Sequence, residues 1–221
     1  MDEATEHRMS ADDRIEQARR LYERALFGGD TDAVGTAERQ LDAVEADLAL
    51  ARGRIAHARF LNDGHEDPQE LSLFERAAEL HRNLGNVHGE AEALFWIGCF
   101  HQVVRADDTT ALPVLEQAHQ KAVQADDPLT ASYALRHLGM ADHKAGRLDQ
   151  AQARLEESTH LRRKIGFLPG VAANLIGLAY LTAAQGHRDK ALTLLDEAAS
   201  LAATAHAHGI LRHVGEARRQ L

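Results

Sequence analysis

The sequence repeats itself with a period of 40 residues over positions 95–198. Small residues recur at this spacing, and so do the large apolar residues between them. The small sets are Cys99, Gly139 and Ala179; Ala111, Ala151 and Ala191; and Ala118, Ser158 and Ala198, and the large sets are Phe95, Leu135 and Leu175, and Leu115, Leu155 and Leu195. A fixed period of this length is typical of stacked repeats, in which each unit buries its apolar face only against its neighbours. Such an array is a surface for binding, so the repeat constrains the fold far more than the function.

The composition indicates that the repeated units are helical. Alanine and leucine dominate the apolar residues, which make up 44% of the chain, whereas aromatic residues make up 5% and only four prolines occur. Unbranched side chains lose little rotamer freedom in a helix. We therefore predict an all-α fold, an α-solenoid of antiparallel helix pairs with about ten helices.

Capping and turn signals divide the first 90 residues. Residues 1–9 are expected to be disordered. A first helix is expected to begin near Ser10 and to end at Gly28-Gly29, because serine caps helix N-termini and glycine accepts the left-handed conformation that ends a helix. A second helix follows from about Asp32, and the sequence leaves open whether it breaks before Leu48. A third is expected to begin at Asp67-Pro68, with proline in its first turn.

Turn residues 40 positions apart set the rest of the chain. Gly146 and Gly186 mark the turn inside a helix pair, and Asp127-Pro128 and Leu168-Pro169 mark the joins between pairs. The expected helices lie near 88–105, 109–125, 128–145, 148–165, 169–185 and 188–206. The predicted organisation is N-terminal helices over 10–47, repeats over 48–208 (about 48–86, 88–127, 128–168 and 169–208), and a capping helix over 209–221.

Charge and cysteine content exclude several classes of partner. The net charge of −9 is uneven, because residues 1–100 carry 21 acidic and 11 basic side chains while residues 101–221 carry 13 and 14. No dense run of Lys and Arg is present, so we expect no nucleic-acid partner. No apolar run is long enough for a membrane span, and residues 1–10 do not resemble a secretory signal. We therefore expect a cytoplasmic protein, with its single cysteine, Cys99, as a buried spacer.

Residues 131–158 resemble a tetratricopeptide repeat. Leu138-Gly139, Gly146 at the turn, Ala151, Leu155 and Ser158 fit the small and large positions of that family. Copies at 178–198 and, more weakly, at 98–118 follow the same spacing, and an older copy at about 53–84 lies outside the register. The usual unit has 34 residues, so a 40-residue unit implies longer helices. The wording of the copies is similar to the repeats of bacterial transcriptional regulators and of stand-alone repeat proteins.

The resemblance implies a right-handed superhelix with a concave groove lined by the first helix of each pair. In the 40-residue frame, the inward positions of these helices collect an aromatic wall with one arginine and one histidine. The candidate ligand-binding or partner-binding residues are Trp96, Phe100, Tyr133, Arg136, Met140, His143 and Tyr180. Apolar area would supply affinity, and Arg136 could hold a carboxylate with two hydrogen bonds. The alternative is that these side chains pack between helices as core.

No catalytic or metal-binding motif stands out. The fourteen histidines include no pair at i and i+4, no His-Glu-x-x-His and no cluster with cysteine. A nucleophile elbow, a phosphate loop and a dinucleotide fingerprint are likewise missing from the sequence. We expect no metal and no cofactor, and the chain reads as a non-enzyme more than as an enzyme.

Three function hypotheses follow from these observations. The first is a non-enzymatic interaction module, possibly regulatory in role, that holds a peptide or partner protein in its groove. The second is a sensor that binds a small molecule in a closed pocket around Trp96, Tyr133 and Arg136. The third, and weakest, is an enzyme on a helical-repeat scaffold, which would use His143 with Arg136. A homodimer is compatible with each hypothesis.

Overall fold

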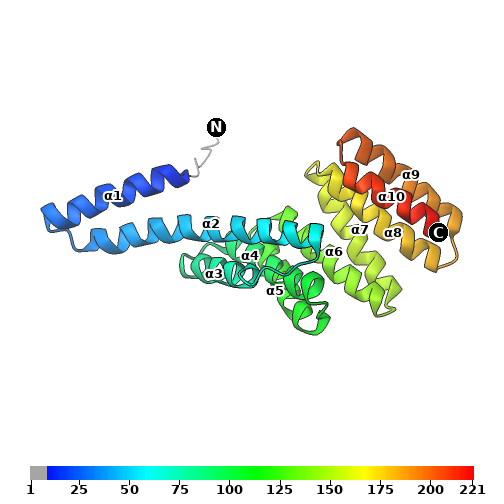
Figure 1. Cartoon of the computed structure of the whole chain (residues 1–221), viewed down its shortest axis with the longest axis horizontal. Coiled ribbons are helices and arrows are strands. Elements are labelled where there is room, and N and C mark those ends of the chain that lie inside the picture. The colour runs from blue at the N-terminus through cyan, green and yellow to red at the C-terminus, as the bar shows by residue number, and fades with distance from the viewer. Residues whose placement is uncertain (1–8) are drawn as a thin grey trace. The chain divides into compact units, whose positions relative to one another are not determined.

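The computed structural model describes residues 9–221 and is all-helical over that range. Ten α-helices and one short π-helix follow one another there, and consecutive helices pack side by side (Figure 1). The predicted all-α helical-repeat fold is thus confirmed. The expectation of disorder for residues 1–9 lies outside the described residues, except for Met9, which belongs to no helix.

The chain divides into two compact units, Met1–Ala93 and Leu94–Leu221. The first contains α1 (Ala11–Gly28), α2 (Asp32–Asp63) and α3 (Glu70–Asn83). The predicted cap at Ser10 is present, since its hydroxyl accepts the N–H of Asp13 at 3.1 Å. Gly29 and Gly64 end α1 and α2 in the left-handed conformation. Pro68 precedes α3 by two residues, so it lies in the turn before the helix and not in the first helical turn.

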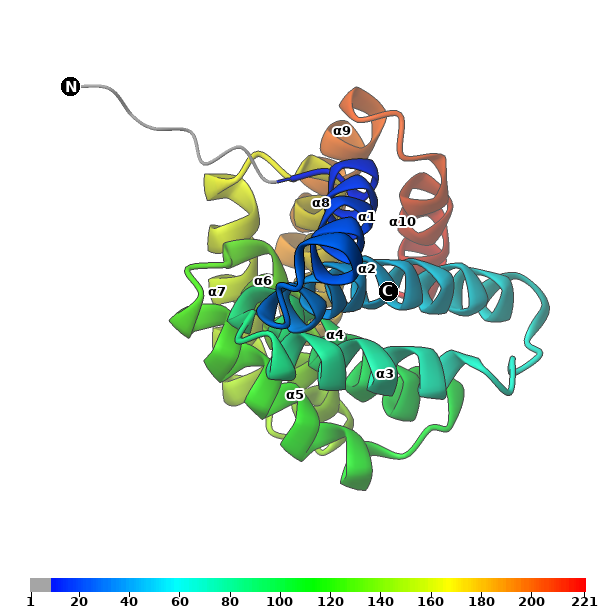
Figure 2. The ribbon, with the colours of Figure 1, turned by 90° about the vertical axis from the view of Figure 1, so that its left-hand side faces the viewer.

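Helix α2 runs unbroken for 32 residues, and α3 lies beside its C-terminal half (Figure 2). The boundary predicted between residues 47 and 48 is therefore wrong, because it falls inside this helix. Residues 40–52 carry no glycine or proline, so nothing in the backbone interrupts the hydrogen-bond ladder. Gly53 is accommodated instead of ending the helix: a Cβ there would lie 2.5 Å from the ring of Phe74.

The second unit is built on a backbone period of 20 residues. Left-handed residues occur at Ala106, Asp126, Gly146, Gly166, Gly186 and His206. A new 17-residue or shorter helix begins two residues after each of them: α5 (Asp108–Gln124), α6 (Pro128–Lys144), α7 (Leu148–Lys164), α8 (Leu168–Ala184), α9 (Arg188–Thr204) and α10 (His208–Gln220). The 40-residue sequence repeat is thus two turns of one structural repeat of 20.

One extra residue enters the array at its start. Gly85 is also left-handed, but 21 residues separate it from Ala106, not 20. The helix between them begins as α4 (Val87–Cys99) and ends as the π-helix η1 (Phe100–Val104). A π-helical turn holds one residue more than an α-helical turn, so η1 absorbs the insertion without disturbing the turn at Ala106.

Small residues of the repeat allow close contact between paired helices. At Gly139 in α6, an added Cβ would lie 3.3 Å from the carbonyl oxygen of Ala151 and from Cγ of Leu155 in α7. Cys99 is buried, as predicted for a spacer. The glycine with the closest contact in the first pair is its neighbour Gly98, whose Cβ would lie 2.6 Å from Leu115. Helix α10 covers the end of the array with buried Val214 and Ala217.

Candidate functional site

Four of the seven predicted groove residues line one cavity in the second unit. The cavity has a volume of about 330 Å³ and lies between α6 and α8, with Leu155 of α7 at its base. Arg136, Met140 and His143 come from α6, and Tyr180 comes from α8. The remaining wall consists of Gly139, Lys144, Ile176 and Gly177. The first helices of two adjacent pairs thus form the cavity, as the 40-residue frame predicts.

Arg136 is held at the edge of this cavity by the partner helix. Its Nη1 donates to the carbonyl oxygen of Ala173 at 2.9 Å and to Oδ1 of Asn174 at 3.0 Å. Its Nε and Nη2 donate no hydrogen bond to any residue among 9–221, and no carboxylate lies within ion-pair distance. The guanidinium therefore has donors left for a ligand.

A second arginine lies behind the first. Arg162 of α7 is 1% exposed and donates to the hydroxyl of Ser132, to the carbonyl oxygen of Gly170 and to Oδ1 of Asn174. Its guanidinium also lies 4.8 Å from the centre of the Tyr133 ring, a cation–π contact. Its Nη2 has no hydrogen-bond partner among the described residues. Asn174 thus accepts from both arginines, and they lie in one polar network.

The network carries positive charge without a compensating carboxylate. Its other members are neutral: Asn174 donates to the hydroxyl of Ser158 at 2.8 Å, and that hydroxyl donates to the carbonyl oxygen of Ser132 at 2.6 Å. Desolvation, with repulsion from Arg136 as a second cause, lowers the pKa of Arg162 to about 10. Desolvation also lowers the pKa of Arg136. Both groups remain cationic near neutral pH, so an anion at the cavity would be favoured.

The rim of the cavity is mixed in character. Met140 is 42% exposed, and the hydroxyl of Tyr180 donates to Oε1 of Gln220 at 2.8 Å. Lys144 is already paired, because its Nζ lies 2.6 Å from Oδ2 of Asp108. Arg136 is therefore the cation of this cavity that lacks a carboxylate partner.

The other three predicted residues lie elsewhere. Phe100 is completely buried in η1, so its prediction as a ligand contact is wrong: the π-helical turn places its ring in the core. Trp96 and Tyr133 are half-buried and both pack on Phe95, at ring-centre distances of 5.1 and 5.3 Å. Neither of them lines the cavity of Arg136. They belong to an aromatic cluster that joins α4 to α6.

The sequence analysis missed Arg162 and Asn174. Arg162 stands in the run Leu161-Arg162-Arg163-Lys164, which resembles the basic last turn of a helix. Asn174 offered a usable signal, because it is the one amide side chain in the otherwise apolar stretch 168–181. A polar residue inside an apolar helix must find a partner.

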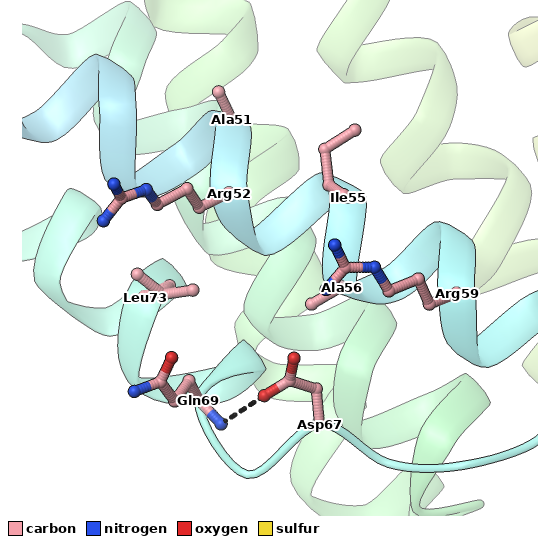
Figure 3. A pocket seen from close by; sticks show the side chains of 8 residues that line it. All are labelled: Ala51, Arg52, Ile55, Ala56, Arg59, Asp67, Gln69 and Leu73. Atoms are coloured by element: carbon pink, nitrogen blue, oxygen red, sulfur yellow. Dashed lines mark hydrogen bonds between the residues drawn. The ribbon is translucent and has the colours of Figure 1, made fainter.

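The first unit has two further cavities, both on α2. One, of about 400 Å³, lies between α1 and α2 and is lined mainly by Ile15, Tyr22, Val34 and Leu41. The other, of about 380 Å³, lies between α2 and α3 (Figure 3). Its sticks show Arg52, Ile55 and Arg59 of α2 along one side, and Oδ1 of Asp67 accepting the N–H of Gln69 at 2.9 Å on the other. No predicted site residue lies in either cavity.

The first unit also contains a buried acid and histidine. Nδ1 of His57 lies 2.8 Å from Oε1 of Glu70, and both side chains are buried. Desolvation raises the pKa of Glu70, and the hydrogen bond to His57 only partly offsets it. Within residues 9–221, no three His, Cys, Asp or Glu side chains gather as metal ligands would. None of the described helices combines the length and the apolar character needed to cross a membrane.

Comparisons with known proteins place few limits on the chain. No family model matches it, and no curated protein matches it. Among solved structures, the crystal structure of BtubC (BKLC) from P. vanneervenii aligns with 90% of this chain and 93% of that chain, at 18% identity and a TM-score of 0.45. A similarity of that size assigns no function to this protein.

Proposed function

We propose that this protein is a non-enzymatic interaction module that binds an acidic peptide segment in the cavity between α6 and α8. The observation that supports this proposal is the guanidinium of Arg136, which borders an apolar cavity and lacks a carboxylate partner. A carboxylate of the peptide would accept from Nε and Nη2, and an apolar side chain would enter between Met140, Ile176 and Tyr180.

The buried network makes this site suited to a fixed geometry. Arg136 is held through Asn174, which Arg162 and Ser158 hold in turn. A guanidinium that is positioned before the ligand arrives loses less conformational entropy on binding. The family resemblance to tetratricopeptide repeats, which mostly bind peptides or proteins, is part of the same proposal. So are a regulatory role, a bacterial origin and a cytoplasmic setting, the last consistent with a single free cysteine.

A peptide library with free C-terminal carboxylates, screened against the same peptides in amidated form, tests the proposal. We expect ligands among the acidic or free-carboxylate members. Arg136→Ala should weaken such a ligand by roughly 2 kcal/mol, about 30-fold, as measured by calorimetry. Arg163→Ala, which removes only the exposed ion pair of Arg163 with Glu197, is the matched control. Equal binding of charged and amidated peptides would contradict the proposal.

Arg136 also has structural contacts, so a second variant is needed. Met140→Glu places a carboxylate on the exposed rim of the cavity and leaves the hydrogen-bond network intact. It should repel an anionic ligand while the helical circular-dichroism signal stays unchanged. A small carboxylate that bound alone, without any peptide, would favour the sensor hypothesis instead.

A further inference from the structure

Four large apolar residues stand exposed at every seventh position of α2. They are Val34, Leu41, Leu48 and Ile55, with exposed fractions of 49%, 47%, 48% and 56%. A spacing of seven residues keeps side chains on nearly the same face of a helix, about 10.5 Å apart along the axis. Such a stripe is typical of a helix that packs along a second helix.

The neighbours of α2 leave this stripe uncovered. Helix α1 packs on the N-terminal half of α2, where Arg14 donates to Oε1 of Gln40 at 2.9 Å. Helix α3 packs on the C-terminal half, against a different face that contains Ala46, Gly53 and His57. The stripe has no helix of its own unit to pack against.

Charged residues follow the same face in a symmetric order. The residues four positions after each apolar one are Glu38, Glu45, Arg52 and Arg59. The first two are acidic and the last two are basic, so the sign of the charge reverses around Leu48. Among residues 9–221, Glu38, Arg52 and Arg59 have no ion-pair partner, whereas Glu45 accepts from Nε of Arg76 at 2.7 Å.

We propose that a second copy of this chain docks on this face, with the two α2 helices antiparallel and Leu48 at the two-fold axis. In that register, Leu48 meets the same residue of the other copy, and Leu41 meets Ile55. Glu38 then lies beside Arg59 of the other copy, and Glu45 lies beside Arg52. Every pair joins positions whose numbers sum to 96 or 97, so one register satisfies the apolar and the charged contacts together. A parallel alignment would place like charges side by side.

The two cavities on α2 fit this register. Val34, Leu41 and Glu38 line the cavity between α1 and α2, while Ile55, Arg52 and Arg59 line the cavity between α2 and α3. Figure 3 shows Ile55 pointing away from α3, at the outer edge of its cavity. Antiparallel docking brings each cavity opposite the other kind, so that apolar side chains fill hollows and acidic residues face basic ones. This inference concerns the first unit and is independent of the proposed peptide site.

Sedimentation of the full chain over a concentration series tests the proposal. We expect a reversible dimer. Leu48→Glu should abolish it, because it places two carboxylates together at the two-fold axis. Leu61→Glu is the control: Leu61 is 64% exposed on the same helix but lies about 140° around it from Leu48. A wild-type chain that remains monomeric, or a dimer that survives Leu48→Glu, would overturn the proposal.

Charge reversal tests the register without touching the apolar stripe. Glu38→Arg alone and Arg59→Glu alone should each raise the dimer dissociation constant about tenfold, since each replaces two attractive contacts by two repulsive ones. The double variant Glu38→Arg/Arg59→Glu restores both contacts and should return to the wild-type value. Failure of the double variant to recover, with both single variants folded by circular dichroism, would count against the antiparallel register.

Disulfide cross-linking distinguishes the two directions. In a Cys99→Ala background, Leu48→Cys should form a covalent dimer on oxidation, because two copies of this position face each other at the axis. Leu41→Cys alone should not, but a mixture of Leu41→Cys and Ile55→Cys chains should. A Leu41→Cys chain that cross-linked to itself as readily as Leu48→Cys would indicate parallel helices and overturn the proposal.

Discussion

At the scale of single residues, the turns of the second unit are held by left-handed residues of unequal suitability. Gly146, Gly166 and Gly186 adopt this conformation without a side-chain penalty. Ala106 adopts it with φ of 52°, although its Cβ makes the left-handed region unfavourable by roughly 1–2 kcal/mol. The turn geometry repeats because the helices on both sides fix it, whether or not the residue suits it.

Ala106→Gly should therefore stabilise the protein by about 0.5–1 kcal/mol. The gain from relieving the left-handed alanine exceeds the entropy that glycine adds to the unfolded chain. Urea denaturation of both proteins measures the difference. Ala145→Gly is the matched control, since Ala145 has an ordinary φ of −84° and should lose about as much as Ala106→Gly gains. Destabilisation by Ala106→Gly would mean that Ala106 is not strained.

The buried Glu70 predicts a pH dependence of stability. Its pKa is raised above 4.5 in the folded state, first by desolvation, and its Oε2 has no hydrogen-bond partner among the described residues. Below pH 4.5 both states hold the protonated acid. As the pH rises above that value, the unfolded chain releases the proton first, so the contribution of Glu70 to stability falls through its folded pKa.

Glu70→Gln removes this ionisation and keeps the size of the side chain. The unfolding free energy of the wild type, relative to that of Glu70→Gln, should therefore be largest near pH 4 and decrease towards neutral pH. Urea denaturation at several pH values measures it. A difference that stayed constant over this range would show that Glu70 titrates as an ordinary exposed acid does.

At the scale of elements, each helix pair depends on one close approach. Gly139 of α6 faces Ala151 and Leu155 of α7, with contacts that already hold a hypothetical Cβ at 3.3 Å. The same position of the next pair is Ala179, which is also buried. A residue larger than alanine at this position must push the two helices apart.

Gly139→Leu should thus destabilise the second unit by about 1–3 kcal/mol. The melting temperature would fall by several degrees, since 1 kcal/mol corresponds to roughly 2–4 °C in a chain of this size. Gly215→Leu in α10 is the control, because a Cβ there meets only a side-chain atom of Arg219 at 3.7 Å. A change of less than a degree for Gly139→Leu would contradict the repeat frame.

At the scale of the whole molecule, the array needs an end. Helix α10 covers the apolar faces of α8 and α9 with Val214 and Ala217, while Arg218 faces outward and pairs with Asp196. Terminal repeats with a polar outer face keep such arrays soluble.

A chain that ends at residue 207 should lose at least about 3 kcal/mol of stability and should bind hydrophobic dyes, because α8 and α9 become exposed. Thermal melts and dye fluorescence measure both effects. Arg218→Ala is the control: it removes only an exposed ion pair and should change stability by less than about 1 kcal/mol. An unchanged melting temperature after truncation would mean that α10 does not act as a cap.

The sequence by itself determined the helical class, the repeat and most helix boundaries. The reason is that these depend on local chemistry: capping by Ser10, glycine at Gly146 and Gly186, and small residues at a fixed spacing. It also placed Arg136, Met140, His143 and Tyr180 on facing positions of adjacent first helices, which the cavity confirms.

Only the tertiary structure decided which side chains share an environment. The π-helical turn that buries Phe100 and the network that joins Arg136 to Arg162 through Asn174 depend on contacts between residues far apart in the sequence. The seven-residue spacing of Val34, Leu41, Leu48 and Ile55 is visible in the sequence, but its exposure is not. Whether such a stripe is core or surface depends on where α1 and α3 pack, and the helix period alone cannot specify that.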